Sequence, residues 1–176
     1  MNEAKRMENL LAGAKILAKS AHKDQFDKAG KPYINHLIAV ADLVKEKGIE
    51  YEIVAWLHDV VEDSHITLEA IENILLYTSD DVEMLDAIDM ITKRDEHKLD
   101  YGAYINRVAS NEISRVVKIA DYTHNADLSR IAKVKFIDRL RKAKYDVSKM
   151  YLETFDHAAR ICREKYDRIN MNSKHF

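Results

Sequence analysis

The segment WLHDVVEDS (residues 56–64) places four ionisable side chains inside an otherwise apolar stretch. Its doublet His58-Asp59 is followed, one helical turn later, by the doublet Glu62-Asp63. An unpaired buried charge is costly, whereas a divalent cation accepts imidazole and carboxylate ligands and would compensate the negative charges. The pattern therefore predicts a metal site with acid–base residues beside it. The alternative is a helix that surfaces at its C-terminal end, with His58 a hydrogen-bonded core residue and the later carboxylates solvated.

Two other apolar segments carry side chains that could complete such a site. His36 lies within INHLIAVA (residues 34–41), and Asp121 follows the buried run RVVKIA. Asn125 stands four residues after Asp121, on the same face of a helix. Each residue also has a simpler explanation: His36 as a satisfied core histidine, and Asp121 as a helix-end residue that pairs with Lys118 or Arg130. Ligand-type residues at apolar positions in three segments nevertheless favour a metal site.

Composition restricts the classes of protein that remain. The chain has 176 residues, 47% hydrophobic and 33% charged, with only four Gly and one Pro, which favours one helical globular domain. A formal net charge of −2 gives no reason to expect nucleic acid or an anionic membrane as partner. The single cysteine, Cys162, excludes an intrachain disulfide. No apolar run approaches membrane-spanning length and charges interrupt the N-terminal helix, so we expect a cytoplasmic protein.

The hydrophobic periodicity predicts a succession of helices with short breaks. Their expected ranges are 2–22, 32–48, 51–62, 67–76, 79 or 80–93, 100–110, 113–125 and 136–169, the last being one helix or two. The pattern is not heptad-regular over the chain, which favours a globular all-α fold over a coiled coil. We expect a single domain over residues 1–176, with a frayed tail at 170–176.

The order His36, His58-Asp59, Asp121 resembles the H…HD…D signature of the HD-domain metal-dependent phosphohydrolases. The segments HKDQFDKAGKPYINHLIAVA, AWLHDVVEDSHIT and VVKIADYTHNADL are similar to the hydrolase domain of the Rel/Spo alarmone enzymes and to stand-alone small alarmone hydrolases. The resemblance extends from the first helix to about Tyr145. It implies a compact helical HD-domain fold and release of the 3′-pyrophosphate from guanosine tetra- or pentaphosphate.

The resemblance also implies a role for each matching residue. One divalent ion, most often manganese (Mn2+), would be held by His36, His58, Asp59 and Asp121. The catalytic pair that positions and activates the attacking water would be Glu62 and Asp63. The expected substrate-binding residues are Lys28, Asn125, Arg141 and Tyr145.

One position departs from the Rel/Spo pattern and bears on the substrate. Asp27 precedes Lys28, where the family usually has an Arg that packs on the guanine base. An Asp cannot provide that stacking platform. Three functions therefore remain: an alarmone hydrolase, an HD phosphohydrolase acting on another nucleotide or phosphate ester, and a non-catalytic nucleotide-binding regulatory protein. We expect a small-molecule nucleotide substrate as partner, and the sequence does not predict the oligomeric state.

Overall fold

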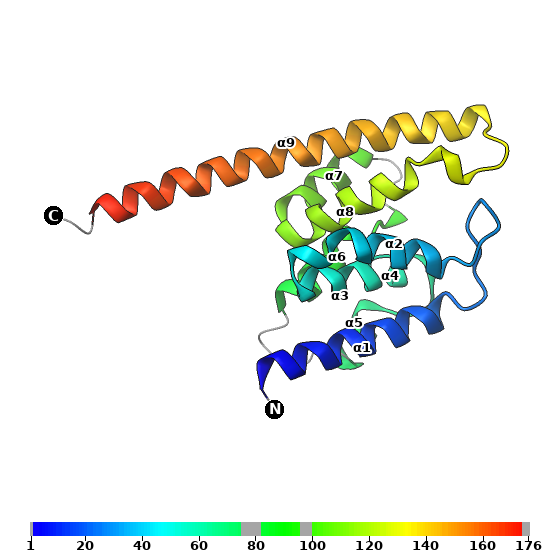
Figure 1. The fold of residues 1–176 in the computed structure, drawn as a ribbon, viewed down its shortest axis with the longest axis horizontal. Coiled ribbons are helices and arrows are strands. Elements are labelled where there is room, and N and C mark those ends of the chain that lie inside the picture. The colour runs from blue at the N-terminus through cyan, green and yellow to red at the C-terminus, as the bar shows by residue number, and fades with distance from the viewer. Residues whose placement is uncertain (1, 75–81, 96–99, 174–176) are drawn as a thin grey trace.

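A computed structural model of the chain describes residues 2–74, 82–95 and 100–173, and these residues form helices joined by short loops (Figure 1). The α-helices are α1 (Glu3–Ala21), α2 (Ile34–Val44), α3 (Ile49–Leu57), α4 (Val60–Asp63), α5 (Leu68–Ile74), α6 (Val82–Ile91), α7 (Tyr101–Ser110), α8 (Glu112–Asn125) and α9 (Phe136–Ser173). Short 3-10 turns occur at η1 (Lys45–Lys47) and η4 (Leu128–Arg130). The expected all-α fold is confirmed.

Helix α3 is the centre of the hydrophobic core. It packs against α1, α2, α6 and α8, and its residues Ile53–Leu57 are all buried. A helical segment that is apolar on every side, as residues 53–57 are, is stable only when neighbours cover it completely. Gly48 precedes α3 with a φ of 145°, a conformation that side chains with a Cβ rarely adopt, and this lets the chain turn sharply from η1 into α3.

Polar caps fix the start of several helices close to the expected positions. Asn2, Asp100 and Asn111 cap α1, α7 and α8, each through a side-chain oxygen that accepts a backbone N–H. Such caps satisfy donors that have no partner inside the helix. The ends of α7 and α8 therefore agree with the sequence prediction to within one residue.

The expected continuous helix over residues 51–62 is wrong, because the chain breaks at His58-Asp59 into α3 and α4. Asp59 has φ −104° and ψ −5°, which interrupts the regular helix, and α4 resumes with the Asp63 N–H donating to the Asp59 carbonyl at 2.8 Å. The Asp59 carboxylate is held by the Tyr33 hydroxyl of a distant loop. That tertiary contact, which the local pattern does not contain, accompanies the break.

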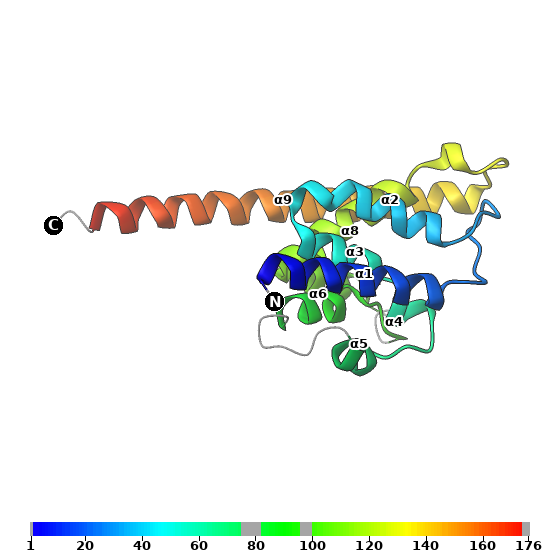
Figure 2. The same ribbon diagram turned by 60° about the horizontal axis from the view of Figure 1, so that its bottom comes forward.

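Helix α9 is a single helix of 38 residues rather than two. Its first half packs on α7 and α8, and its second half extends beyond the rest of the molecule (Figures 1 and 2). Residues 170–173 of the expected frayed tail are helical, and 174–176 lie outside the described residues. Within the described part of the chain, none of the helices is both long and apolar enough to cross a membrane.

Candidate metal centre and adjoining pocket

The four predicted metal ligands come from three different parts of the fold and meet at one point. His36 is on α2, His58 and Asp59 are at the break after α3, and Asp121 is on α8. The His36 Nε2 lies 3.2 Å from Asp121 Oδ1 and 3.5 Å from Asp59 Oδ2. The His58 Nε2 lies 3.0 Å from Asp59 Oδ2 and 3.9 Å from Asp121 Oδ1. Ligand atoms of His36, His58 and Asp121 all lie within 4.8 Å of one another, close enough to share one ion.

Two histidine nitrogens at this point are better suited to binding a metal than to forming a hydrogen bond. The Nε2 atoms of His36 and His58 are buried, and neither has a hydrogen-bond partner with acceptable geometry. The His58 Nδ1 lies 2.7 Å from the Ala55 carbonyl oxygen, to which it donates. In the neutral ring the Nε2 lone pair therefore faces carboxylate oxygens, an arrangement that a divalent cation stabilises. Two imidazoles and two carboxylates are a donor set suited to a divalent first-row metal.

The charged groups at this centre strongly influence one another. Burial disfavours protonation of His36, but the nearby carboxylates of Asp121 and Asp59 outweigh it and raise the pKa of His36 to about 9. Burial opposes ionisation of Asp59 and Asp121 as well. His58 and His36 nevertheless hold the pKa of Asp59 well below its usual range. Lys118 and His36 do the same for the pKa of Asp121. The two aspartates are thus ionised, and a metal would replace the proton on His36.

Three further side chains orient the aspartates. The Tyr33 hydroxyl donates to Asp59 Oδ2 at 2.7 Å, and the Asn125 amide donates to Asp121 Oδ1 at 2.5 Å. Lys118, which is buried, pairs with Asp121 Oδ2 at 2.9 Å. The Lys118 pairing considered from the sequence is therefore correct, and it leaves the other Asp121 oxygen directed at the histidines. Hydrogen bonds and ion pairs to a ligating carboxylate fix its orientation toward the metal.

His36 is held on its other side by a chain of contacts that sequence reasoning missed. Its Nδ1 lies 2.7 Å from the Nδ1 of His124, and the Arg130 guanidinium contacts the His124 ring. Partial burial, His36 and Arg130 lower the pKa of His124 to about 4, so that at neutral pH its Nδ1 can accept the His36 N–H. Arg130 in turn pairs with Asp27 Oδ2 at 3.0 Å. The unusual Asp27 is therefore an anchor for Arg130.

The predicted catalytic pair lies beside the metal centre on α4, but its two members have different surroundings. The Glu62 carboxylate is fixed by Lys93, with 2.5 Å from Oε1 to the Lys93 Nζ and 3.2 Å from Oε2 to the Lys93 backbone N. Asp63 is reached by solvent through the pocket. Partial burial, Asp59 and Glu62 raise its pKa above the ordinary value. A carboxylate with a raised pKa is suited to accepting a proton from water.

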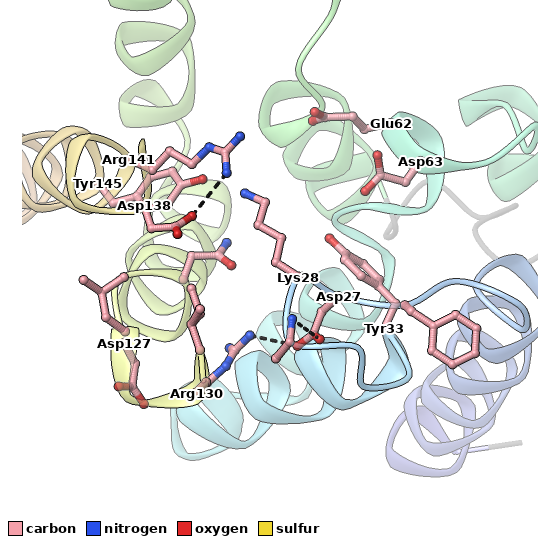
Figure 3. A pocket seen from close by; sticks show the side chains of 15 residues that line it. Asp27, Lys28, Tyr33, Glu62, Asp63, Asp127, Arg130, Asp138, Arg141 and Tyr145 are labelled. Carbon is pink, nitrogen blue, oxygen red and sulfur yellow. Dashed lines mark hydrogen bonds and ion pairs between the residues drawn. The ribbon is translucent and has the colours of Figure 1, made fainter. Parts of the chain in front are cut away.

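A pocket of about 430 Å³ opens next to this pair (Figure 3). All four predicted substrate-binding residues line it together with Glu62 and Asp63. In Figure 3 the Lys28 side chain points toward Arg141 and Asp138, while Asp27 and Arg130 lie at the edge opposite Glu62 and Asp63. The lining residues are Phe26, Asp27, Lys28, Ala29, Tyr33, Glu62, Asp63, Asn125, Asp127, Leu128, Arg130, Ile131, Asp138, Arg141 and Tyr145.

A smaller chamber of about 150 Å³ shares part of this lining and extends to Asp59 and Asp121. Three lysines line it: Lys93, Lys118 and Lys144. Partial burial and then the charges of Lys93 and Lys118 lower the pKa of Lys144. Lys93 and Lys118 already pair with Glu62 and Asp121, so a phosphate that entered the chamber would meet these two ion pairs together with the Lys144 ammonium. Lys93 and Lys118 have no motif that could have placed them in the chamber from the sequence.

Helices that bring two histidines and two aspartates together in an all-α frame define an HD-type fold. A solved structure supports this class. It is the structure of a metazoan ortholog of SpoT that hydrolyses ppGpp. This chain superposes on it with a TM-score of 0.65 and 20% sequence identity, over 88% of this chain and 87% of the solved chain. At this identity the likeness establishes the fold alone. No protein-family model matches the chain.

Curated proteins of known name are also similar to this chain. It is 31% identical over 121 residues to the bifunctional (p)ppGpp synthase/hydrolase SpoT of Escherichia coli, across 65% of the chain and 17% of that protein. It is 31% identical over 116 residues to the guanosine-3′,5′-bis(diphosphate) 3′-pyrophosphohydrolase of Haemophilus influenzae, across 62% of the chain and 17% of that protein. The chain is thus similar, over 62% to 65% of its length, to proteins named as (p)ppGpp hydrolases or pyrophosphohydrolases, and the matches span 17% of those proteins.

Proposed function

We propose that this chain is a single-domain, Mn2+-dependent hydrolase that releases the 3′-pyrophosphate from guanosine tetra- or pentaphosphate. The observation that carries the proposal is the convergence of His36, His58, Asp59 and Asp121, with two buried histidine nitrogens that have no hydrogen-bond partner. The relatives named as 3′-pyrophosphohydrolases support the choice of reaction.

The metal would be held by the two histidine Nε2 atoms and by oxygens of Asp59 and Asp121. When bound, it supplies a Lewis acid that polarises a phosphoryl oxygen and makes water acidic near neutral pH. Asp63 is placed to accept the proton of the attacking water, since its raised pKa lies nearer the working pH. Glu62 orients that water while Lys93 keeps its carboxylate in a fixed position.

The cations of the two connected cavities give the substrate its orientation. Lys93, Lys118 and Lys144 surround the chamber next to the metal centre, so the pyrophosphate would lie there. The nucleoside would occupy the larger pocket, where Lys28 and Arg141 reach the remaining phosphates. Fixed cations that face the developing charge of a phosphoryl transfer stabilise the transition state.

Asp27 supports a second candidate, an HD phosphohydrolase acting on another nucleotide or phosphate ester. Its Oδ1 accepts the backbone N–H groups of Ala29 and Lys31, each at 2.9 Å, and its Oδ2 pairs with Arg130. The carboxylate is thus occupied by its own loop and by Arg130, and it does not serve as a stacking platform for guanine. The third candidate, a non-catalytic nucleotide-binding regulator, gains no support from Asp63 and Glu62, which a binding protein does not need.

The test is a turnover assay on metal-stripped protein reloaded with Mn2+, using guanosine tetraphosphate and a panel of common nucleotides with product identification. Release of pyrophosphate and GDP from the alarmone, absent in His58→Ala, is the expected result. Phosphate release from another nucleotide alone would select the second candidate. Tight nucleotide binding by fully metal-loaded protein without any turnover would select the third.

A further inference from the structure

Helix α9 carries a row of large apolar side chains exposed to solvent. The exposed fractions are 74% for Phe136, 49% for Leu140, 63% for Val147, 62% for Met150 and 47% for Ile161. Single exposed apolar residues are common on proteins, but a contiguous row along one helix is typical of an interaction surface.

The spacing of this row is that of a coiled coil. Positions alternate by four and three residues, and the intervening members are also exposed. We call this set the α9 seam: Phe136, Leu140, Ala143, Val147, Met150, Thr154, His157 and Ile161. Such a repeat keeps one narrow stripe facing a partner helix over several turns.

The α9 seam faces away from the rest of the molecule. The buried residues of α9 in the described range, Asp138, Ser148 and Leu152, lie on the opposite side, where α9 packs against α7 and α8. Beyond these contacts α9 projects as a lone helix (Figures 1 and 2). Most of the stability of a helix in a protein comes from packing of one of its faces, so the projecting part of α9 gains stability from a partner.

We propose that the α9 seam packs antiparallel against the α9 seam of a second copy of this chain. A two-fold interface must be complementary to itself. Centred between Ala143 and Val147, the antiparallel pairing sets Leu140 of one copy against Met150 of the other and Ala143 against Val147. Each layer then combines a larger with a smaller or flexible side chain, which allows close packing.

Flanking charges favour the antiparallel over the parallel arrangement. The antiparallel pairing places Arg139 of one copy near Glu153 of the other, twice per dimer. The two Asp146 residues meet at the centre, and each already pairs with Lys142 of its own helix at 2.7 Å. In a parallel pair, the positions facing Arg139 and Glu153 would be Lys144 and Ala158, neither of which carries the opposite charge.

The first experiment is analytical ultracentrifugation of the full chain over a range of concentrations. The expected mass at high concentration is twice the chain mass of 20.4 kDa. The double variant Val147→Glu with Met150→Glu places charges inside the seam and should weaken the dimer at least about 100-fold. Ile16→Glu, at an exposed apolar position on α1, is the matched control and should leave the dimer intact.

A charge-reversal series tests the direction of pairing. Arg139→Glu and Glu153→Arg should each weaken the dimer, and combining both in one chain should restore it, because opposite charges face again. Circular dichroism of each variant confirms that the helices persist. A chain that stays monomeric at all concentrations, or a dimer that persists in the folded seam double variant, contradicts the proposal. A dimer that the double reversal does not restore contradicts the antiparallel direction.

Discussion

The two sides of the candidate site are built in different ways. The metal side consists of short side chains on α2, on α8 and at the break after α3, and His36, His58 and Asp121 are 3%, 1% and 3% exposed. The nucleotide side consists of longer side chains from loops and helix ends, among them Lys28 and Arg130. Rigid, buried elements hold reacting groups in place, whereas surface loops can change without disturbing the core. The difference teaches that the chemistry of this fold can stay fixed while its substrate changes.

Removing one metal ligand should have the largest effect. His58→Ala is expected to abolish stoichiometric metal binding and to lower activity by roughly 10⁴-fold, because the Lewis acid is lost. Metal content after dialysis and turnover of the alarmone measure both effects. His65→Ala, at an exposed position seven residues later, is the control and should keep metal and activity. A His58→Ala protein with full metal content would show that the ligand set is wrong.

The catalytic pair should separate chemistry from metal binding. Asp63→Asn is expected to reduce kcat by roughly 10³-fold with metal content unchanged, because the proton acceptor is lost. Glu62→Gln should reduce kcat less, and it should also lower the pKa of Asp63, since a negative neighbour is removed. The acid limb of its residual pH–rate profile should therefore move to lower pH. An unmoved acid limb would argue that Asp63 is not the group that titrates.

Substitutions on the nucleotide side should change binding more than chemistry. Arg141→Ala is expected to raise KM by about 10- to 100-fold with a small change in kcat, because a charge-assisted contact to phosphate is lost. Lys142→Ala, at the next position on α9, removes a charge that pairs with Asp146 and should leave KM unchanged. If kcat of Arg141→Ala instead falls about 10- to 100-fold, Arg141 stabilises the transition state. The nucleotide side would then contribute to the chemistry as well as to binding.

Asp27 tests whether the two sides are independent. Asp27→Asn weakens the hold on Arg130 and, through His124, on His36. We expect a fall of about threefold to tenfold in Mn2+ affinity, smaller than the effect of removing a direct partner of a ligand. Calorimetric titration of the metal-free protein measures it, with Asp24→Asn, at an exposed position shortly before Asp27, as the control. An unchanged Mn2+ affinity in Asp27→Asn would show that the nucleotide side does not influence metal binding.

The smallest expected effect is a pH dependence of substrate binding. The pKa of Lys144 is lowered by partial burial and by Lys93 and Lys118, so its positive charge is lost at lower pH than for an ordinary lysine. KM for a polyanionic substrate should therefore rise by about threefold as the pH increases into the alkaline range. Lys144→Arg keeps the charge and should flatten that rise. If KM of Lys144→Arg rises with pH as much as that of the unmodified protein, the titrating group is not Lys144.

Much of the site followed from residue types and local spacing. An HD doublet and an ED doublet in an apolar helix, with His36 and Asp121 in other apolar segments, were enough to predict six residues that the fold brings together. Helix ends were also predictable where a capping side chain marks them, as at Asp100 and Asn111. Both kinds of signal consist of residue types and of spacing inside single segments, so one sequence contains them in full.

Other features depend on contacts between distant segments. Glu62 is fixed by Lys93, 31 residues away, and Asp27 by Arg130, 103 residues away. The break between α3 and α4 accompanies the bond from Tyr33 to Asp59, which no local pattern contains.

The sequence by itself thus determined which side chains could do chemistry and which helices carry them. Only the tertiary structure decided how those helices face one another, and therefore which cations surround the site and which face of α9 stays exposed. The physical reason is that helical periodicity specifies a buried face but not the neighbour that buries it.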